Sequence, residues 1–142
     1  MTLTQAQSHF DSYADAFTRR DMSAIAGMWQ YPCFITDNSG GASFRDKDAF
    51  QRNLDRMGGF YDAQGVRHAD ASVQTVESNY DGVAHVRVDY RFADADGQTI
   101  IAWPTDYVLR QNTDGAWKAC FAVADGETAA WAARGTPLGA KN

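Results

Sequence analysis

Apolar side chains near the start of the chain recur at the spacing of a helix. In residues 3–20 four of them follow the i, i+3, i+4, i+7 pattern, with charged residues between them, which predicts an amphipathic helix. These four are Phe10, Tyr13, Ala14 and Phe17. Asp21 is a suitable N-cap for a second, short helix whose inner positions include Ile25 and Trp29.

A third helical pattern begins after Asp46 or Asp48, either of which can cap it. Its inward positions are Phe50, Leu54 and Met57. The pair Gly58-Gly59 is expected to end this helix, because glycine favours helix termini. Residues 60–65 are then expected to form an irregular connection.

The pattern changes to a period of two in the second half of the chain. Residues 83–92 alternate cleanly between apolar and polar side chains, as expected of a strand with one buried face. Turn sequences at residues 38–41, 94–97 and 112–115 predict hairpins. The remaining predicted strands cover residues 33–37, 42–45, 66–78, 100–109 and 117–123.

Helices that precede strands indicate an α+β fold. We expect three N-terminal helices packed in the concave side of a curved antiparallel sheet, which leaves a cone-shaped internal cavity. Pro104 is expected at a bulge where this sheet bends. Residues 1–127 are predicted to form a single domain. Residues 128–142 contain Gly135, Pro137 and Gly139 and are predicted to be a loosely packed tail, or one that rests on a neighbour.

Composition narrows the function. The formal net charge is −5 and no Lys/Arg run is present, so nucleic acid and anionic membrane are disfavoured as partners. The first residues lack secretory features and no stretch is long and apolar enough to span a membrane, so we expect a cytoplasmic protein. Cys33 and Cys120 are expected to be buried thiols. The three histidines lack metal-ligand spacing, so a metal is not expected.

One acid stands out in the predicted strand of residues 100–109. Alternation places Asp106 on the same face as Ile100 and Val108, and burial among such neighbours would raise its pKa and keep it neutral. Alternatively, Asp106 is solvated at a bend beside Pro104. The opposite face carries Trp103 and Tyr107 and is apolar too. Both faces must then be buried, which predicts a homodimer through the convex face.

Three positions carry a resemblance to a known family. Tyr13 lies on the inner face of the first helix, Asp37 ends the first short strand, and Pro104-Thr105-Asp106 forms a Pro-x-Asp element on a central strand. In this respect residues 8–127 resemble the NTF2-like (cystatin-like α+β cone) superfamily. Within it the sequence is most similar to the Δ5-3-ketosteroid isomerases and SnoaL-type cyclases.

The resemblance implies proton transfer next to a carbonyl group, without a cofactor, on a small hydrophobic ligand. Asp37 would be the proton shuttle, and Tyr13 with protonated Asp106 would hold the enolate oxygen. The residues predicted to contact the substrate are Phe17, Leu54, Met57, Val86, Val88 and Val108.

Other functions stay open at this point. If His68 reaches the cavity, dehydratase or cyclase chemistry becomes possible. The same fold also serves non-catalytic modules that bind an apolar metabolite, in which Tyr13 is only a packing residue. A pure protein-interaction domain would instead fill the cavity with its own side chains.

Overall fold

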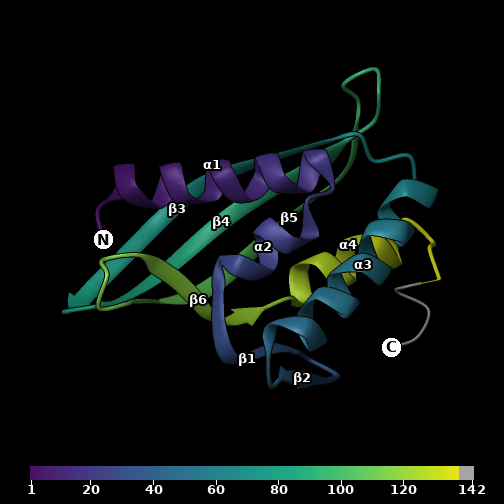
Figure 1. Cartoon of the computed structure of the whole chain (residues 1–142). Helices are drawn as coiled ribbons and strands as arrows, with labels where there is room; N and C mark the ends of the chain where they lie inside the picture. The colour runs from purple at the N-terminus through teal and green to yellow at the C-terminus, as the bar shows by residue number, and fades with distance from the viewer. Residues whose placement is uncertain (138–142) are drawn as a thin grey trace.

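A computed structural model, which describes residues 1–137, has four helices packed against one curved six-stranded sheet (Figure 1). The helices are α1 (Leu3–Arg19), α2 (Met22–Gly27), α3 (Lys47–Ala63) and α4 (Asp125–Ala133). The strands are β1 (Trp29–Asp37), β2 (Gly40–Phe44), β3 (His68–Tyr80), β4 (Val83–Ala93), β5 (Thr99–Gln111) and β6 (Trp117–Val123). The predicted α+β class is confirmed.

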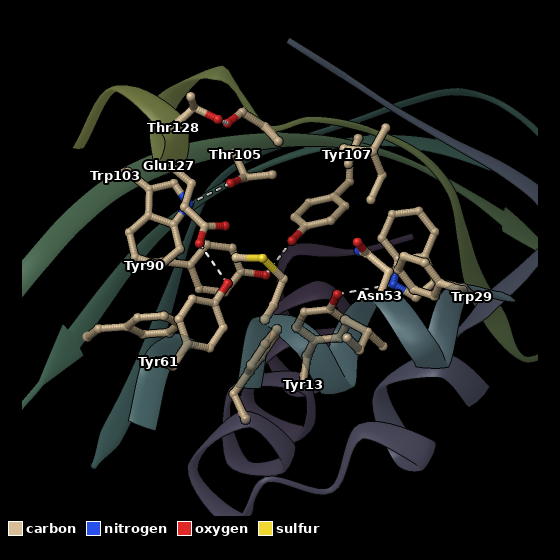
Figure 2. Close-up of a pocket in the computed structure, with 18 residues that line it drawn as sticks. Tyr13, Trp29, Asn53, Tyr61, Tyr90, Trp103, Thr105, Tyr107, Glu127 and Thr128 are labelled. Carbon is tan, nitrogen blue, oxygen red and sulfur yellow. Dashed lines mark hydrogen bonds between the residues drawn. The ribbon is translucent and has the colours of Figure 1, made fainter. Parts of the chain in front are cut away.

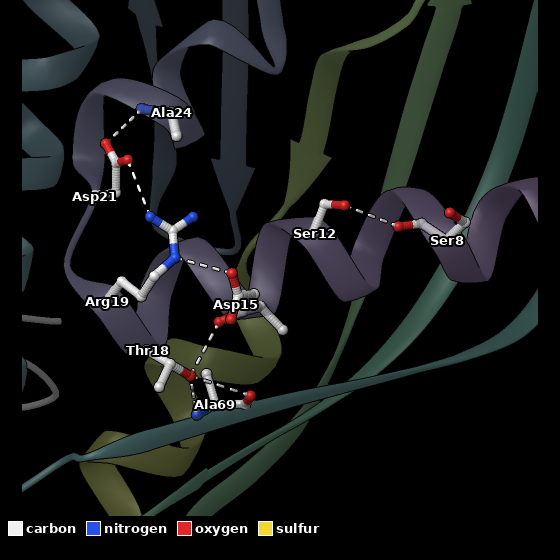
Figure 3. A network of polar contacts seen from close by, with 9 residues as sticks. Ser8, Ser12, Asp15, Thr18, Arg19, Asp21, Ala24 and Ala69 are labelled. Atoms are coloured by element: carbon white, nitrogen blue, oxygen red, sulfur yellow. Dashed lines mark hydrogen bonds and ion pairs between the residues drawn. The ribbon is translucent and has the colours of Figure 1, made fainter.

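The first two helices start where the sequence predicts, and their first turns are capped by side chains. Thr2 and Gln5 make a reciprocal capping box at the start of α1. Arg20 adopts a left-handed conformation with φ of 58°, which ends α1 and lets Asp21 cap α2 through Ala24 N. Figure 3 shows Arg19 bridging Asp15 and Asp21 at this junction.

The second helix is shorter than predicted, because α2 ends at Gly27 and Trp29 begins β1. Trp29 pairs with Ala119 of β6, and its ring packs 4.9 Å from the ring of Phe50. Trp29 is therefore a core residue of β1, and it lies on the side of the sheet that faces α3.

The prediction that Gly58-Gly59 ends the third helix is wrong, since α3 continues to Ala63. Gly58 instead permits close packing: a Cβ at this position would lie 2.7 Å from Met22 Cε. The extra turn of helix includes Tyr61, which is buried with 3% exposure. This turn supplies one of the groups of the candidate site.

The sheet has the order β2-β1-β6-β5-β4-β3, and all neighbours are antiparallel except β1 and β6. The expected bulge at Pro104 is absent, because Pro104 pairs with Asp89 in an unbroken stretch of the β4–β5 register. The β5–β6 ladder begins at Asp106–Val123, so Pro104 lies past its end. The missing N–H of Pro104 therefore removes no bond to β6.

The prediction of a loose C-terminal tail is wrong for the residues that the structure describes. The chain forms α4 directly after β6, so the predicted boundary at residue 127 falls inside a helix. Trp131 is fully buried, with ring centroids 5.0 Å from Phe60 and 6.1 Å from Tyr61. The last part of the predicted tail, residues 138–142, lies outside the described residues.

Within residues 1–137, no helix has both the length and the apolar character needed to cross a bilayer. The predicted buried thiols are found as free cysteines, Cys33 buried and Cys120 partly so. The described residues also contain no group of His, Cys, Asp or Glu arranged to hold a metal ion.

Candidate functional site

A cavity of about 210 Å³ lies between the helices and the inner face of the sheet (Figure 2). Half of the residues that line it are aromatic, and they come from α1, α3, β1, β4 and β5. The aromatic residues are Tyr13, Phe17, Trp29, Phe50, Tyr61, Tyr90, Phe92, Trp103 and Tyr107. The cavity is not filled by its own side chains, as a pure protein-interaction domain would require.

Glu127, in the first turn of α4, carries the only ionic side chain among the described residues that line this cavity. Its Oε2 accepts hydrogen bonds from the Tyr61 hydroxyl at 2.6 Å and from Trp131 Nε1 at 3.1 Å. Its Oε1 receives no hydrogen bond from the described residues. One oxygen is thus held in place, while the other is available to a ligand.

Burial raises the pKa of the Glu127 carboxyl above its usual value, because an apolar surrounding disfavours the charged form. The hydrogen bonds from Tyr61 and Trp131 act in the opposite direction and offset part of this effect. A carboxylate with a raised pKa is a stronger base than an exposed one, which suits it to accept a proton.

The position of Glu127 depends on its neighbour Gly126. A Cβ at residue 126 would lie 2.5 Å from Pro104 O and 3.1 Å from Pro104 Cδ, so only glycine lets α4 approach β5 this closely. The close approach sets the depth at which Glu127 enters the cavity. Gly126 is therefore a positioning residue for Glu127.

We expect Gly126→Ala to displace α4 and to destabilise the protein by about 1–3 kcal/mol, as overpacking typically does. The contact is with backbone, which cannot rotate away. Gly59→Ala is the matched control, because Gly59 is also helical and nothing lies within 4 Å of its added Cβ. Urea unfolding of both variants measures the difference. Equal stability of the two variants would contradict the assigned role of Gly126.

Hydroxyl groups from the sheet and from α1 line the same cavity as Glu127 (Figure 2). Tyr13 Oη accepts a hydrogen bond from Trp29 Nε1 at 3.0 Å, and the Tyr90 and Tyr107 hydroxyls lie 2.7 Å apart. A single proton joins Tyr90 to Tyr107, and Trp29 supplies its own proton to Tyr13. At least one tyrosine O–H is therefore left to donate to a ligand.

Thr105 repeats this arrangement on β5. Its Oγ1 accepts a hydrogen bond from Trp103 Nε1 at 3.0 Å, so its hydroxyl proton is available as a donor. Indole N–H groups thus occupy acceptor positions on both Tyr13 and Thr105. Each of these hydroxyls still has its proton to donate to a ligand.

The tyrosines of the cavity are neutral. Burial raises the pKa of Tyr13, Tyr90 and Tyr107, and the charge of Glu127 contributes a smaller rise to each. The carboxylate and the three hydroxyl-bearing residues line the same cavity.

The structure places only one of the three predicted catalytic residues in the cavity. Tyr13 lines it as expected from its helical spacing, and its catalytic role stays a prediction. Asp37 does not line it: its Oδ1 accepts hydrogen bonds from Ser39 N at 2.9 Å and Ser39 Oγ at 2.6 Å in the β1–β2 turn. These hydrogen bonds lower the pKa of Asp37, which makes it a weaker base.

The expectation that Asp106 lies in the cavity is wrong. Alternation along β5 was predicted correctly, but the inward face is the one with Trp103, Thr105 and Tyr107. Asp106 lies on the opposite face, where its carboxylate is about half exposed and forms an ion pair with Arg87 at 2.9 Å. The burial on which a neutral Asp106 depended is therefore missing.

Some of the predicted substrate contacts line the cavity and others do not. Phe17, Leu54 and Met57 line the cavity. Val86 and Val88 are buried in the core but do not line it. Val108 shares the outer face of β5 with Asp106, so its predicted contact is wrong for the same reason.

The outer sheet face has apolar residues as well. Phe34 is 39% exposed and stacks on Phe121, with ring centroids 5.8 Å apart. Val108 and Val123 lie in a shallow groove beside Phe121. The homodimer through this face stays a prediction.

The position of His68 decides whether a histidine can take part in chemistry in the cavity. His68 is exposed at the start of β3 and does not line the cavity, which removes the basis for histidine-dependent chemistry.

Glu127 was missed because the glycines and the proline after it indicated a tail. The available signal was the i, i+4 spacing of Glu127 and Trp131, which places an acid and an apolar ring on one helix face.

These features define an NTF2-like protein: a cone of curved sheet and helices around an aromatic cavity. The chain belongs to the family described as NTF2-like protein (DUF6841), whose model matches residues 4–127. No curated protein matches the sequence.

Solved structures with the same fold include a ketosteroid isomerase-like protein from Erwinia carotovora atroseptica, with a TM-score of 0.64 and 17% identity over 85% of this chain and 92% of that one. A domain of unknown function with a cystatin-like fold from Nostoc punctiforme has a TM-score of 0.67 and 14% identity, covering 84% of this chain and 74% of the other. ActVI-ORFA from Streptomyces coelicolor has a TM-score of 0.66 and 12% identity, covering 84% and 92%. At these identities the likeness concerns the fold alone.

Proposed function

We propose that this protein is a cofactor-free enzyme that transfers a proton on a small, mainly apolar carbonyl compound, as an isomerase or a related lyase. The observation that carries the proposal is the environment of Glu127. One carboxylate oxygen is fixed by Tyr61 and Trp131, and the other is available in a cavity that also contains hydroxyl donors. Glu127 takes the role that the sequence resemblance gave to Asp37.

In the proposed reaction, Glu127 Oε1 removes a proton from the carbon next to the carbonyl group. The electron pair of the broken C–H bond forms the new C=C bond, and the carbonyl oxygen becomes an enolate oxygen. A hydroxyl of Tyr13 or of the Tyr90–Tyr107 pair donates to that oxygen. In a β,γ-unsaturated substrate, return of the proton from Glu127 to the γ carbon moves the C=C bond into conjugation, the C=O bond re-forms, and the isomerisation is complete.

The charges support this sequence of events. The cavity holds one negative charge on Glu127 before proton transfer and one on the enolate afterwards. The neutral tyrosines, whose pKa values are raised by burial, remain donors throughout. The charge therefore moves within an apolar space without a second charge forming there.

The general reaction is tested by isotope exchange. A panel of small enolisable ketones and enones is incubated with the protein in D₂O, and loss of the α-proton signal is followed by NMR. We expect exchange well above the buffer rate for at least one compound. Compounds that bind in the cavity without any accelerated exchange would contradict the enzyme proposal and favour a non-catalytic binding module.

A further inference from the structure

We infer that the substrate enters the cavity as an uncharged, single-ring-sized compound with an oxygen acceptor, and that Glu127 excludes anions from the site. This inference rests on the proposed function and deepens it, because it names the class of ligand that the same cavity accepts. It follows from the charges, the hydrogen-bonding groups and the volume of the cavity.

The charged groups of the cavity disfavour an anionic ligand. No Lys, Arg or His is among the described residues that line it, so nothing there balances a second negative charge beside Glu127. Arg20, whose charge acts on the cavity residue Tyr61, is engaged by Asp62 and Val66 O. An anion would therefore meet Glu127 at short range in a medium of low polarity, where like charges repel strongly.

The hydrogen-bonding groups disfavour cations. Indole N–H groups already donate to Tyr13 and Thr105, so both hydroxyls present a proton to the ligand. An ammonium group has only donors and would leave these protons without an acceptor. A carbonyl oxygen accepts hydrogen bonds from these hydroxyls, and it adds no charge beside Glu127.

The volume limits the size of the ligand. A cavity of about 210 Å³ is smaller than the roughly 300–1,000 Å³ of pockets that hold drug-sized ligands. Its aromatic walls are well matched to one flat ring, because rings pack against one another edge to face or offset. A substrate with four fused rings is too large for the space between α3, α4 and the sheet.

Three ligands of nearly equal size and different charge test the inference: acetophenone, benzoate and benzylammonium. Their affinities for the wild type and for Glu127→Gln are measured at about pH 8, well above the ordinary pKa of a carboxyl group, by ligand-observed NMR and by quenching of tryptophan fluorescence. We expect wild type to bind acetophenone at least roughly tenfold more tightly than benzoate, which carries a second negative charge. Acetophenone should also bind more tightly than benzylammonium, which leaves the hydroxyl protons of Tyr13 and Thr105 without an acceptor. In Glu127→Gln, the affinity for benzoate should rise by roughly tenfold or more, while that for acetophenone changes little.

Asp37→Asn is the matched control, since it removes one negative charge outside the cavity and should leave the order of affinities unchanged. Benzoate bound by wild type as tightly as acetophenone, or a benzoate affinity unaffected by Glu127→Gln, would overturn the role of Glu127. Tightest binding of benzylammonium would identify a cation site instead, and failure of all three to bind would overturn the size class. Because no turnover is required, selective binding without isotope exchange would refute the proposed enzyme and leave this inference intact.

Discussion

Glu127→Gln is expected to reduce the rate of α-proton exchange by roughly 10²–10⁴-fold, the range that a positioned general base contributes. Glutamine keeps the size of the side chain and an oxygen that can accept from Tyr61, but it cannot take up a proton from carbon. NMR exchange rates of the purified variant in D₂O, with a ketone that the wild type turns over, provide the measurement.

Asp37→Asn is the decisive comparison, because Asp37 is the acid that the sequence resemblance assigned to proton transfer. Its carboxylate is engaged by Ser39 in the β1–β2 turn, so we expect exchange to change by less than about threefold. If Asp37→Asn abolishes exchange while Glu127→Gln retains it, the assignment to Glu127 is wrong and the sequence-based one is right.

The same Glu127→Gln variant should be at least as stable as the wild type at about pH 8. A carboxyl whose pKa is raised in the folded state keeps its proton longer when folded than when unfolded. Stability therefore falls as the pH rises from the ordinary value of 4.5 through the raised one, and glutamine avoids this loss. Thermal unfolding at several pH values should show a difference that disappears toward acid pH. A variant less stable than the wild type at about pH 8 would mean that the Tyr61 and Trp131 hydrogen bonds outweigh the cost of burial.

Trp131→Ala is expected to destabilise the protein by about 3–5 kcal/mol, the range for truncating a buried Trp. Trp131 is fully buried between α4 and α3, packs on Phe60 and Tyr61, and donates to Glu127. Its loss leaves a cavity and removes one of the two groups that fix the carboxylate. Urea unfolding at equilibrium measures the effect.

Tyr80→Ala is a suitable control for Trp131→Ala, because Tyr80 is 75% exposed and should contribute less than about 0.5 kcal/mol. A loss below about 1 kcal/mol on Trp131→Ala would show that α4 is a peripheral segment, as the sequence had indicated. It would also remove the structural basis for placing Glu127 in the cavity.

The helices were predictable because their signals are local. The spacing of Phe10, Tyr13 and Phe17 specifies the buried stripe of α1, and Asp21 specifies the start of α2. Gly58 misled the prediction of α3 because its role depends on Met22, a residue far away in sequence. A glycine that permits close packing and one that ends a helix look the same in the sequence.

The site was harder to predict because it depends on which sheet face turns inward. Both faces of β5 carry apolar residues, so the pattern of β5 alone could not decide whether Asp106 or Thr105 points into the cavity. Its neighbour β4 carries the answer: Arg87 pairs with Asp106, and Val88 pairs with Thr105. The clean alternation of β4 assigns the faces once this register is known, and register between strands is a tertiary property.

Glu127 is a half-buried, ionisable group that lines the cavity, and its titration tests its role in proton transfer most directly. The protein is labelled with ¹³C at the glutamate side-chain carboxyl carbons, and the Glu127 signal is assigned by its absence in Glu127→Gln. The account predicts that this carboxyl titrates with a pKa clearly above 4.5, and that the midpoint shifts when acetophenone occupies the cavity. A Glu127 pKa at or below 4.5 that does not respond to the ligand would contradict it.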